Sequence, residues 1–231
     1  MTTAFVTGAN KGIGFALAEE LLKKNYRVIV GARDLKRGTD AVNALSKFGD
    51  ARLQIIDVAN LDSIHAAADN IKKNFDDLTI LVNNAGIAGD MHKTAWDFTA
   101  QELIDVYMVD FIGAFEVTKC LLPLIEKNHG RIFNITMPVK AIKTFHPLAY
   151  QAAKAPMNVM IENFGWEFAE KKMSAQMVGI MPGIVSTDLN NHIQGDSVIT
   201  PAQSARLVID VILSKENLNG KIINVENNFK K

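Results

Sequence analysis

Tyr150 and Lys154 lie four residues apart in a segment of helical character. On a helix, this spacing puts both side chains on the same face. A free tyrosine has a pKa of about 10, and a neighbouring ammonium group favours the phenolate and brings that pKa closer to neutral. The pair is therefore a candidate for proton transfer, although the same spacing alone is also typical of an ordinary helix surface.

A glycine cluster near the N-terminus follows a short apolar run and predicts a phosphate site at a strand-to-helix turn. Glycines let the backbone turn tightly against a pyrophosphate, and the free amides at the start of a helix stabilise its charge. The spacing Gly-x-x-x-Gly-x-Gly differs from the usual G-x-G-x-x-G pattern, and a plain tight turn is the alternative. The cofactor-binding residues expected here are Gly8, Asn10, Lys11, Gly12, Ile13 and Gly14.

Arg33 follows the second predicted strand, where folds of this kind recognise the adenine ribose. A guanidinium group there suits the 2′-phosphate of NADP, whereas a carboxylate would suit the 2′-hydroxyl of NAD. Lys11 adds a second positive charge near the same phosphate. Both residues could instead be solvated surface cations, and Asp34 could pair with Arg33 or repel the phosphate. The sequence favours NADP(H).

Two further turns are expected to contact the nucleotide. Asp57 and Val58 follow the third predicted strand and suit the adenine amino group and ring. Asn84, Ala85 and Gly86 follow the fourth, where small residues let the backbone approach the sugar. Each of these short segments is unspecific when taken alone.

Short apolar runs alternate with segments of helical period, which predicts repeated β-α units around a parallel sheet. Caps support two helix starts: Asn60 or Asp62 can cap one helix, and Thr200 precedes a proline at the start of another. The predicted strands are 3–7, 27–31, 52–56, 78–82, 130–136, 175–181 and 221–225, and the helices 13–24, 35–47, 61–74, 99–127, 148–172 and 201–213. Residues 188–200 are expected to form a mobile loop.

Composition bounds the class of protein. The chain has 231 residues, 48% hydrophobic and 22% charged, which fits one domain over residues 1–231. Lys+Arg and Asp+Glu both total 25, so no net charge favours nucleic acid or an anionic membrane. Cys120 is the single cysteine, and no leader or membrane span is expected, so the predicted location is cytoplasmic. No metal site is expected.

Together these elements resemble the short-chain dehydrogenase/reductase family, and most closely its NADPH-dependent carbonyl reductases. The motifs that carry the resemblance span residues 7–14, 83–86, 150–154, 182–183 and 187–188. The resemblance implies an α/β fold with a single Rossmann-type, doubly wound parallel sheet of about seven strands and helices on both faces. It also implies bound NADP(H), a small carbonyl or alcohol substrate, and a homodimer or homotetramer.

The resemblance also assigns roles to individual residues. Tyr150 would exchange a proton with the substrate oxygen, and Lys154 would hydrogen-bond the nicotinamide ribose. Asp110 stands where the family commonly has an asparagine that supports the lysine, and an aspartate there would tend to raise the lysine's pKa. The nicotinamide would lie beside Pro182, Gly183, Val185 and Thr187.

One departure concerns the substrate oxygen. The family commonly places a serine thirteen positions before the tyrosine, and this chain has Met137 there. A thioether cannot donate a hydrogen bond. Thr136 should point to the other side of the strand, because side chains alternate. Thr144 and His146 are possible replacement donors, although loop roles are the alternative.

The substrate pocket is expected to include Met137, His146 and His192. The main functional hypothesis is hydride transfer between NADP(H) and a carbonyl or alcohol, with an altered oxyanion site. Two alternatives stay open: an NADP(H)-binding protein with little turnover, and an isomerase or eliminase on the same fold.

Overall fold

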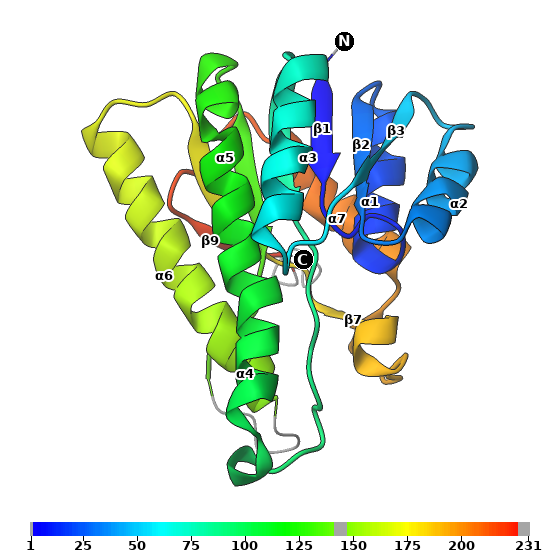
Figure 1. Ribbon diagram of the computed structural model, residues 1–231, viewed down its shortest axis with the longest axis vertical. Helices are drawn as coiled ribbons and strands as arrows, with labels where there is room; N and C mark the ends of the chain where they lie inside the picture. The colour runs from blue at the N-terminus through cyan, green and yellow to red at the C-terminus, as the bar shows by residue number, and fades with distance from the viewer. Residues whose placement is uncertain (1, 141–146, 226–231) are drawn as a thin grey trace.

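Seven parallel strands form the central sheet, in the order β3-β2-β1-β4-β5-β6-β9 (Figure 1). The computed structural model describes residues 2–140 and 147–225. The strands are β1 Thr3–Val6, β2 Arg27–Ala32, β3 Ala51–Ile55, β4 Leu78–Asn83, β5 Arg131–Ile135, β6 Gln176–Met181 and β9 Ile222–Asn224. The order reverses between β1 and β4, as in a Rossmann-type, doubly wound sheet. The predicted fold class is confirmed.

Helices cover both faces of the sheet. Figure 1 shows α3, α5 and α6 in front of the strands and α1 and α7 behind them. The helix bounds are α1 Gly12–Lys23, α2 Leu35–Leu45, α3 Leu61–Asn74, α4 Ala100–Tyr107, α5 Gly113–Lys127, α6 Leu148–Glu170 and α7 Pro201–Leu213. Asn60, rather than Asp62, caps α3 by accepting from the Ser63 amide, and Thr200 forms a capping box with Gln203.

The core has two halves, one on each face of the sheet. Neighbouring residues of β1 divide between them: Val6 packs with α1 and α7, and Phe5 packs with α3 and α5. Strands buried on both faces read as continuous apolar runs, which is why the sequence locates them well.

The helix predicted over 99–127 is not a single α-helix. Residues Met108–Ile112 form a π-helical segment between α4 and α5. In a π segment the backbone bonds run from i to i+5, so the helix accommodates an extra residue, and such segments are frequent at functional sites. Asp110 lies inside this segment.

The loop predicted at 188–200 also contains regular structure. Asp188–Asn190 form a 3₁₀ turn, and β8 Val198–Ile199 pairs in parallel with β7 Ile184–Val185. A second 3₁₀ turn, Ala95–Asp97, was not anticipated. Elements of two or three residues are too short to produce a periodic pattern in the sequence.

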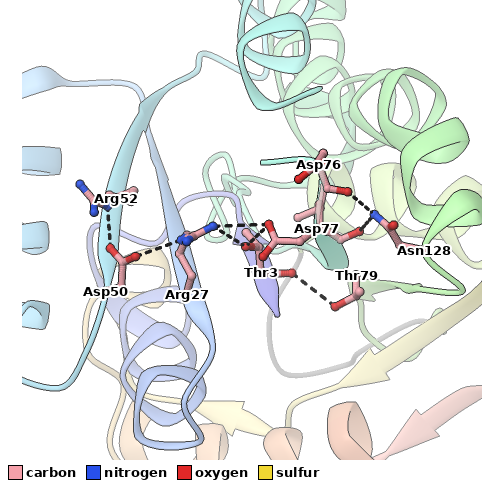
Figure 2. Close-up of polar contacts among 9 residues, drawn as sticks. Thr3, Arg27, Asp50, Arg52, Asp76, Asp77, Thr79 and Asn128 are labelled. Atoms are coloured by element: carbon pink, nitrogen blue, oxygen red, sulfur yellow. Dashed lines mark hydrogen bonds and ion pairs between the residues drawn. The ribbon is translucent and has the colours of Figure 1, made fainter. Parts of the chain in front are cut away.

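A polar network ties the strands together at their amino ends (Figure 2). Arg27 on β2 donates to Asp50 Oδ2 at 2.9 Å and to Asp77 Oδ1 at 3.4 Å, and Arg52 on β3 donates to Asp50 Oδ1 at 2.6 Å. Thr3 on β1 donates to Asp77 Oδ1 at 2.7 Å. The network lies at the amino ends of the strands, and the site described below lies at their carboxyl ends. Among the described residues, no helix is both long and apolar enough to cross a membrane.

Candidate active site

One cavity of about 340 Å³ lies at the carboxyl ends of the strands. Open α/β sheets bind their ligands at this end. It brings together most of the residues predicted for the cofactor and for catalysis. Its lining includes Gly8, Asn10, Lys11, Gly12, Ile13, Arg33, Asp57, Val58, Asn84, Ala85, Gly86, Tyr150, Lys154 and Thr187. These residues come from six separate segments of the chain and share one hollow.

The glycine turn forms one wall of this cavity. Gly8 has φ +65°, in the left-handed region, and a Cβ there would stand 2.9 Å from the Cα of Ala85. A Cβ on Gly14 would collide with the Asn84 side chain and the Gly8 carbonyl, so Gly14 permits close packing behind the turn. Helix α1 begins at Gly12 and has no side-chain cap. Its first amides are therefore free to bind an anion.

Thr7 joins the glycine turn to the turn after β4, a role that was not predicted. Its hydroxyl accepts from the amides of Asn84 and Ala85, both at 3.0 Å. Asn84 Nδ2 in return donates to the Thr7 carbonyl at 2.9 Å. A threonine directly before Gly8, at the end of a buried strand, is the signal that could have indicated it.

Three cations line the cavity: Lys11, Arg33 and Arg37. Arg37 was not predicted, although its position four residues after Arg33 at the start of a helix is a usable signal. Asp34 lines the cavity beside them, and its carboxylate accepts from the Arg37 amide at 2.8 Å and caps α2. Lys11 Nζ pairs with Asp188 Oδ2 at 2.7 Å, and both side chains are exposed.

Tyr150 and Lys154 lie on one face of α6, as predicted. Lys154 Nζ is 5.4 Å from the centre of the Tyr150 ring and donates to the Ile135 carbonyl at 3.1 Å. Behind it, the fully buried Asp110 places Oδ2 3.3 Å from Lys154 Nζ. Asp110 Oδ1 accepts from the Ile87 amide at 2.7 Å. The π segment thus supplies a buried carboxylate to the lysine.

The pKa values differ from the sequence-based expectation for the tyrosine. Burial raises the pKa of Tyr150 above its usual value, and the Lys154 charge, which acts in the predicted direction, does not overcome burial and the charge of Asp110. The expectation that the tyrosine pKa falls toward neutral is therefore wrong. For Lys154, burial lowers the pKa, but Asp110 and Tyr150 outweigh it, and the net pKa is raised. The lysine therefore stays charged.

Asp110 responds to the same environment. Burial raises the pKa of its carboxyl group, and Lys154 and the Ile87 amide oppose that rise without cancelling it. The three groups are therefore coupled, and a change in the charge of one shifts the other two.

Met137 follows β5 and is half-buried. Its neighbour Thr136 is buried and donates its hydroxyl to Asn158 Oδ1 at 2.6 Å, while Asn158 Nδ2 donates to the Met137 carbonyl at 3.2 Å. Asn158 on α6 therefore holds the Thr136 hydroxyl, which is not free to replace the missing serine. Asn158 was not predicted, although its position four residues after Lys154 puts it on the same helix face.

Several predicted site residues do not line the cavity. Gly14, Met137, Pro182, Gly183 and Val185 belong to this group. His192 is exposed and does not line the cavity, although it pairs through Nε2 with Oδ1 of the lining residue Asp188 at 2.8 Å. Thr144 and His146 lie outside the described residues, so their predicted roles stay predictions.

A second hollow of about 510 Å³ adjoins the first and shares Lys11, Gly86 and Asp188 with it. It adds Met91 and His92 from the segment after β4.

Residues 2–197 match the model of a family described as short chain dehydrogenase. The chain belongs to the short-chain dehydrogenase family. It is 31% identical to the 3-oxoacyl-acyl-carrier-protein reductase FabG of Haemophilus influenzae over 210 residues, covering 90% of this chain and 81% of that protein. It is 32% identical to carbonyl reductase (NADPH) 1 of Mus musculus over 222 residues, covering 86% and 79%.

The solved structures agree with this assignment. The NADPH-bound carbonyl reductase from chicken fatty liver superimposes with a TM-score of 0.87 at 25% identity, covering 97% of this chain and 96% of that one. The chain is thus a short-chain dehydrogenase/reductase enzyme close to the carbonyl reductases, and the predicted family is confirmed.

Proposed function

We propose that this enzyme reduces a small carbonyl compound with NADPH. The observation that carries the proposal is a single cavity that joins an anion-binding glycine turn and three cations to the Tyr150–Lys154 pair. Similar proteins named as NADPH carbonyl reductases support the cofactor and the substrate class.

The residues present fit NADP(H). Gly8 and the first amides of α1 would hold the pyrophosphate, because Gly8 makes the left-handed turn that leads into the uncapped start of that helix. Arg33 and Arg37 would bind the 2′-phosphate through charge-assisted hydrogen bonds, and Lys11 would join them on leaving Asp188. Asp57 and Val58 line the adenine end, and Lys154 and Thr187 lie at the nicotinamide end.

Tyr150 acts as the general acid in this proposal. Its raised pKa keeps the phenol protonated at neutral pH, which is the form that reduction of a carbonyl requires. When bound, the reduced nicotinamide supplies the hydride. Tyr150 gives its proton to the substrate oxygen, and the nearby Lys154 ammonium stabilises the phenolate left behind.

Met137 leaves the substrate oxygen without the hydroxyl that a serine would supply. Loss of one preorganised donor to an oxyanion typically lowers kcat by about 10²–10³-fold. Asn158 holds the Thr136 hydroxyl, so Tyr150 is the proposed donor to the substrate oxygen. We infer a slow or substrate-restricted reductase with an altered oxyanion site.

The replacement of the serine by Met137 also favours a second candidate, an NADP(H)-binding protein with little turnover. In that case the cofactor site is intact, and Met137 lacks the hydroxyl that efficient turnover needs. The two candidates share their binding residues and differ only in catalysis.

Kinetics with NADPH and a panel of ketones and aldehydes tests the first candidate. Tyr150→Phe is expected to lower the reduction rate by about 100-fold or more, because a positioned general acid contributes about 10²–10⁴-fold. NADPH affinity measured by calorimetry should stay unchanged in this variant and exceed NADH affinity in the wild type. Undiminished turnover by Tyr150→Phe would overturn the role of the phenol.

The same measurements separate the candidates. NADPH binding with no reduction across the panel, together with activity gained by Met137→Ser, supports the binding protein. Robust wild-type turnover rules it out. The homodimer or homotetramer is also proposed, and the cytoplasmic location stays a prediction.

A further inference from the structure

Three potential metal ligands converge on the outside of the molecule, at the seam between α3 and α5. His65 lies on α3, and Glu116 and Cys120 lie one turn apart on α5. The two helices run side by side in front of the sheet (Figure 1). The reductase chemistry proposed above uses none of these residues.

The ligand atoms are close enough to share one ion. His65 Nε2 is 2.8 Å from Glu116 Oε1, Cys120 Sγ is 3.7 Å from the same oxygen, and all three atoms lie within 4.8 Å of one another. Zinc bound tetrahedrally at about 2.0–2.3 Å from such atoms separates them by about 3.4–3.6 Å. The present distances of His65 Nε2 and Cys120 Sγ from Glu116 Oε1, 2.8 and 3.7 Å, are close to these separations.

The helix geometry supports this convergence. Residues four apart, such as Glu116 and Cys120, face the same direction, and His65 approaches from the neighbouring helix. Glu116 is mostly buried, with 12% of its side chain exposed, whereas His65 is 51% exposed. The carboxylate is thus held in place between a half-buried sulfur and a ring that is free to turn.

We propose that His65, Glu116 and Cys120 bind one Zn²⁺ ion, with water in the fourth position. Imidazole, carboxylate and thiolate are the ligand types of protein zinc sites. On binding, the Cys120 thiol gives its proton to the buffer, and the ion replaces the hydrogen bond between His65 and Glu116. The ion would link α3 to α5.

Two lysines lie on the helices that carry these ligands, Lys119 on α5 and Lys72 on α3. Lys119 Nζ lies 3.3 Å from both carboxylate oxygens of Glu116 and competes for that charge. Lys72 pairs with Asp69 on α3, 2.7 Å away. Lys119 is 62% exposed, so its side chain can swing into solvent when an ion binds.

Cobalt substitution on the full chain tests the proposal. After treatment with a chelator and a non-thiol reductant, one equivalent of Co²⁺ should produce a thiolate charge-transfer band and the visible bands of a tetrahedral site. Calorimetry with Zn²⁺ should give one site per chain, and zinc should raise the Tm. Absence of the charge-transfer band in the wild type would overturn the proposal.

Variants show whether these residues hold the ion. Loss of outer-sphere partners alone typically costs about 10–100-fold in metal affinity, so Cys120→Ala and His65→Gln should each cost at least about 100-fold. His192→Gln removes another exposed histidine and should leave binding intact, and Lys119→Gln should strengthen it. A band that persists in Cys120→Ala, or that His192→Gln abolishes, would assign the ion elsewhere and contradict the site.

Discussion

The charge of Asp110 is the residue-scale feature that distinguishes this site. A neutral asparagine at this position would hold Lys154 by a hydrogen bond alone, whereas Asp110 places a carboxylate oxygen 3.3 Å from Lys154 Nζ. The carboxylate offsets part of the positive charge that would otherwise lower the pKa of Tyr150. Asp110 therefore keeps the phenol protonated to higher pH.

The pH dependence of Asp110→Asn tests this role. Asp110 raises the pKa of Tyr150, so removing its charge should lower that pKa and move the alkaline loss of kcat/KM to lower pH. The measurement is the pH profile of NADPH-dependent reduction in wild type and variant. Asp105→Asn, which removes an exposed carboxylate from α4, should leave the profile unchanged. Identical profiles for Asp110→Asn and the wild type would contradict the charge effect.

Sequence reasoning finds residues whose type fits a motif and misses those that act through geometry. Gly8, Arg33, Tyr150 and Lys154 belong to motifs, and the structure brings them to one cavity. Asn158 belongs to no motif, and only the fold brings it to Thr136. The sign of the tyrosine shift also depends on burial, which one sequence does not reveal.

The polar network at the amino ends of the strands is an element-scale feature (Figure 2). Asp50 accepts from both Arg27 and Arg52 and so links β2 to β3. Burial raises the pKa of Asp50, but the two arginine hydrogen bonds outweigh it, and the net pKa lies below its usual value. The network should stabilise the fold without affecting the cleft at the other end of the sheet.

Asp50→Asn is expected to lower the free energy of unfolding by about 1 kcal/mol at pH 7, since partly exposed charged hydrogen bonds contribute modestly. Because the folded pKa is depressed, this contribution is complete above the unfolded value of about 3.9. It should be lost as pH falls through the lower folded pKa. Urea unfolding of both proteins between neutral and acidic pH measures the difference.

A matched control is Asp69→Asn, which removes an exposed carboxylate paired with Lys72. Its effect should be smaller, because solvent screens that pair. A difference between Asp50→Asn and wild type that grows at acid pH would refute the network's role.

The elements themselves were largely predictable. Both ends of each predicted strand of the sheet lie within one residue of the observed bounds. The agreement is close because β-branched runs between helical segments have few alternative interpretations. The π segment was missed because one extra residue barely disturbs the apolar period of a long helix. The pairing of β7 with β8 was missed because two-residue strands carry no period.

At the scale of the whole molecule, two neighbouring helices each carry exposed apolar side chains. Ile104 and Tyr107 on α4 and Val159 and Trp166 on α6 are all exposed. The helices α4 and α6 contact each other, and Figure 1 shows α4 beside the lower end of α6. Clustered apolar exposure of this kind indicates a protein interface, which supports the proposed homo-oligomer.

Light scattering on the purified chain tests this surface. The wild type is expected to be a dimer or tetramer, and Val159→Glu combined with Trp166→Glu should give a monomer, because charge is costly in an apolar interface. Leu35→Glu, on the exposed side of α2, is the control and should keep the wild-type mass. A monomeric wild type would disprove the proposed assembly.

The π segment connects this outer surface to the active site. In an α-helix each residue turns the chain by about 100°, so deleting one residue from Met108–Ile112 would rotate α4 by about that angle relative to α5. Asp110 could then face Lys154 only if Ile104 and Tyr107 turned away from their present direction. One extra residue thus fixes the direction of Ile104 and Tyr107 relative to Asp110, and the two directions cannot be changed separately by altering the length of this helix.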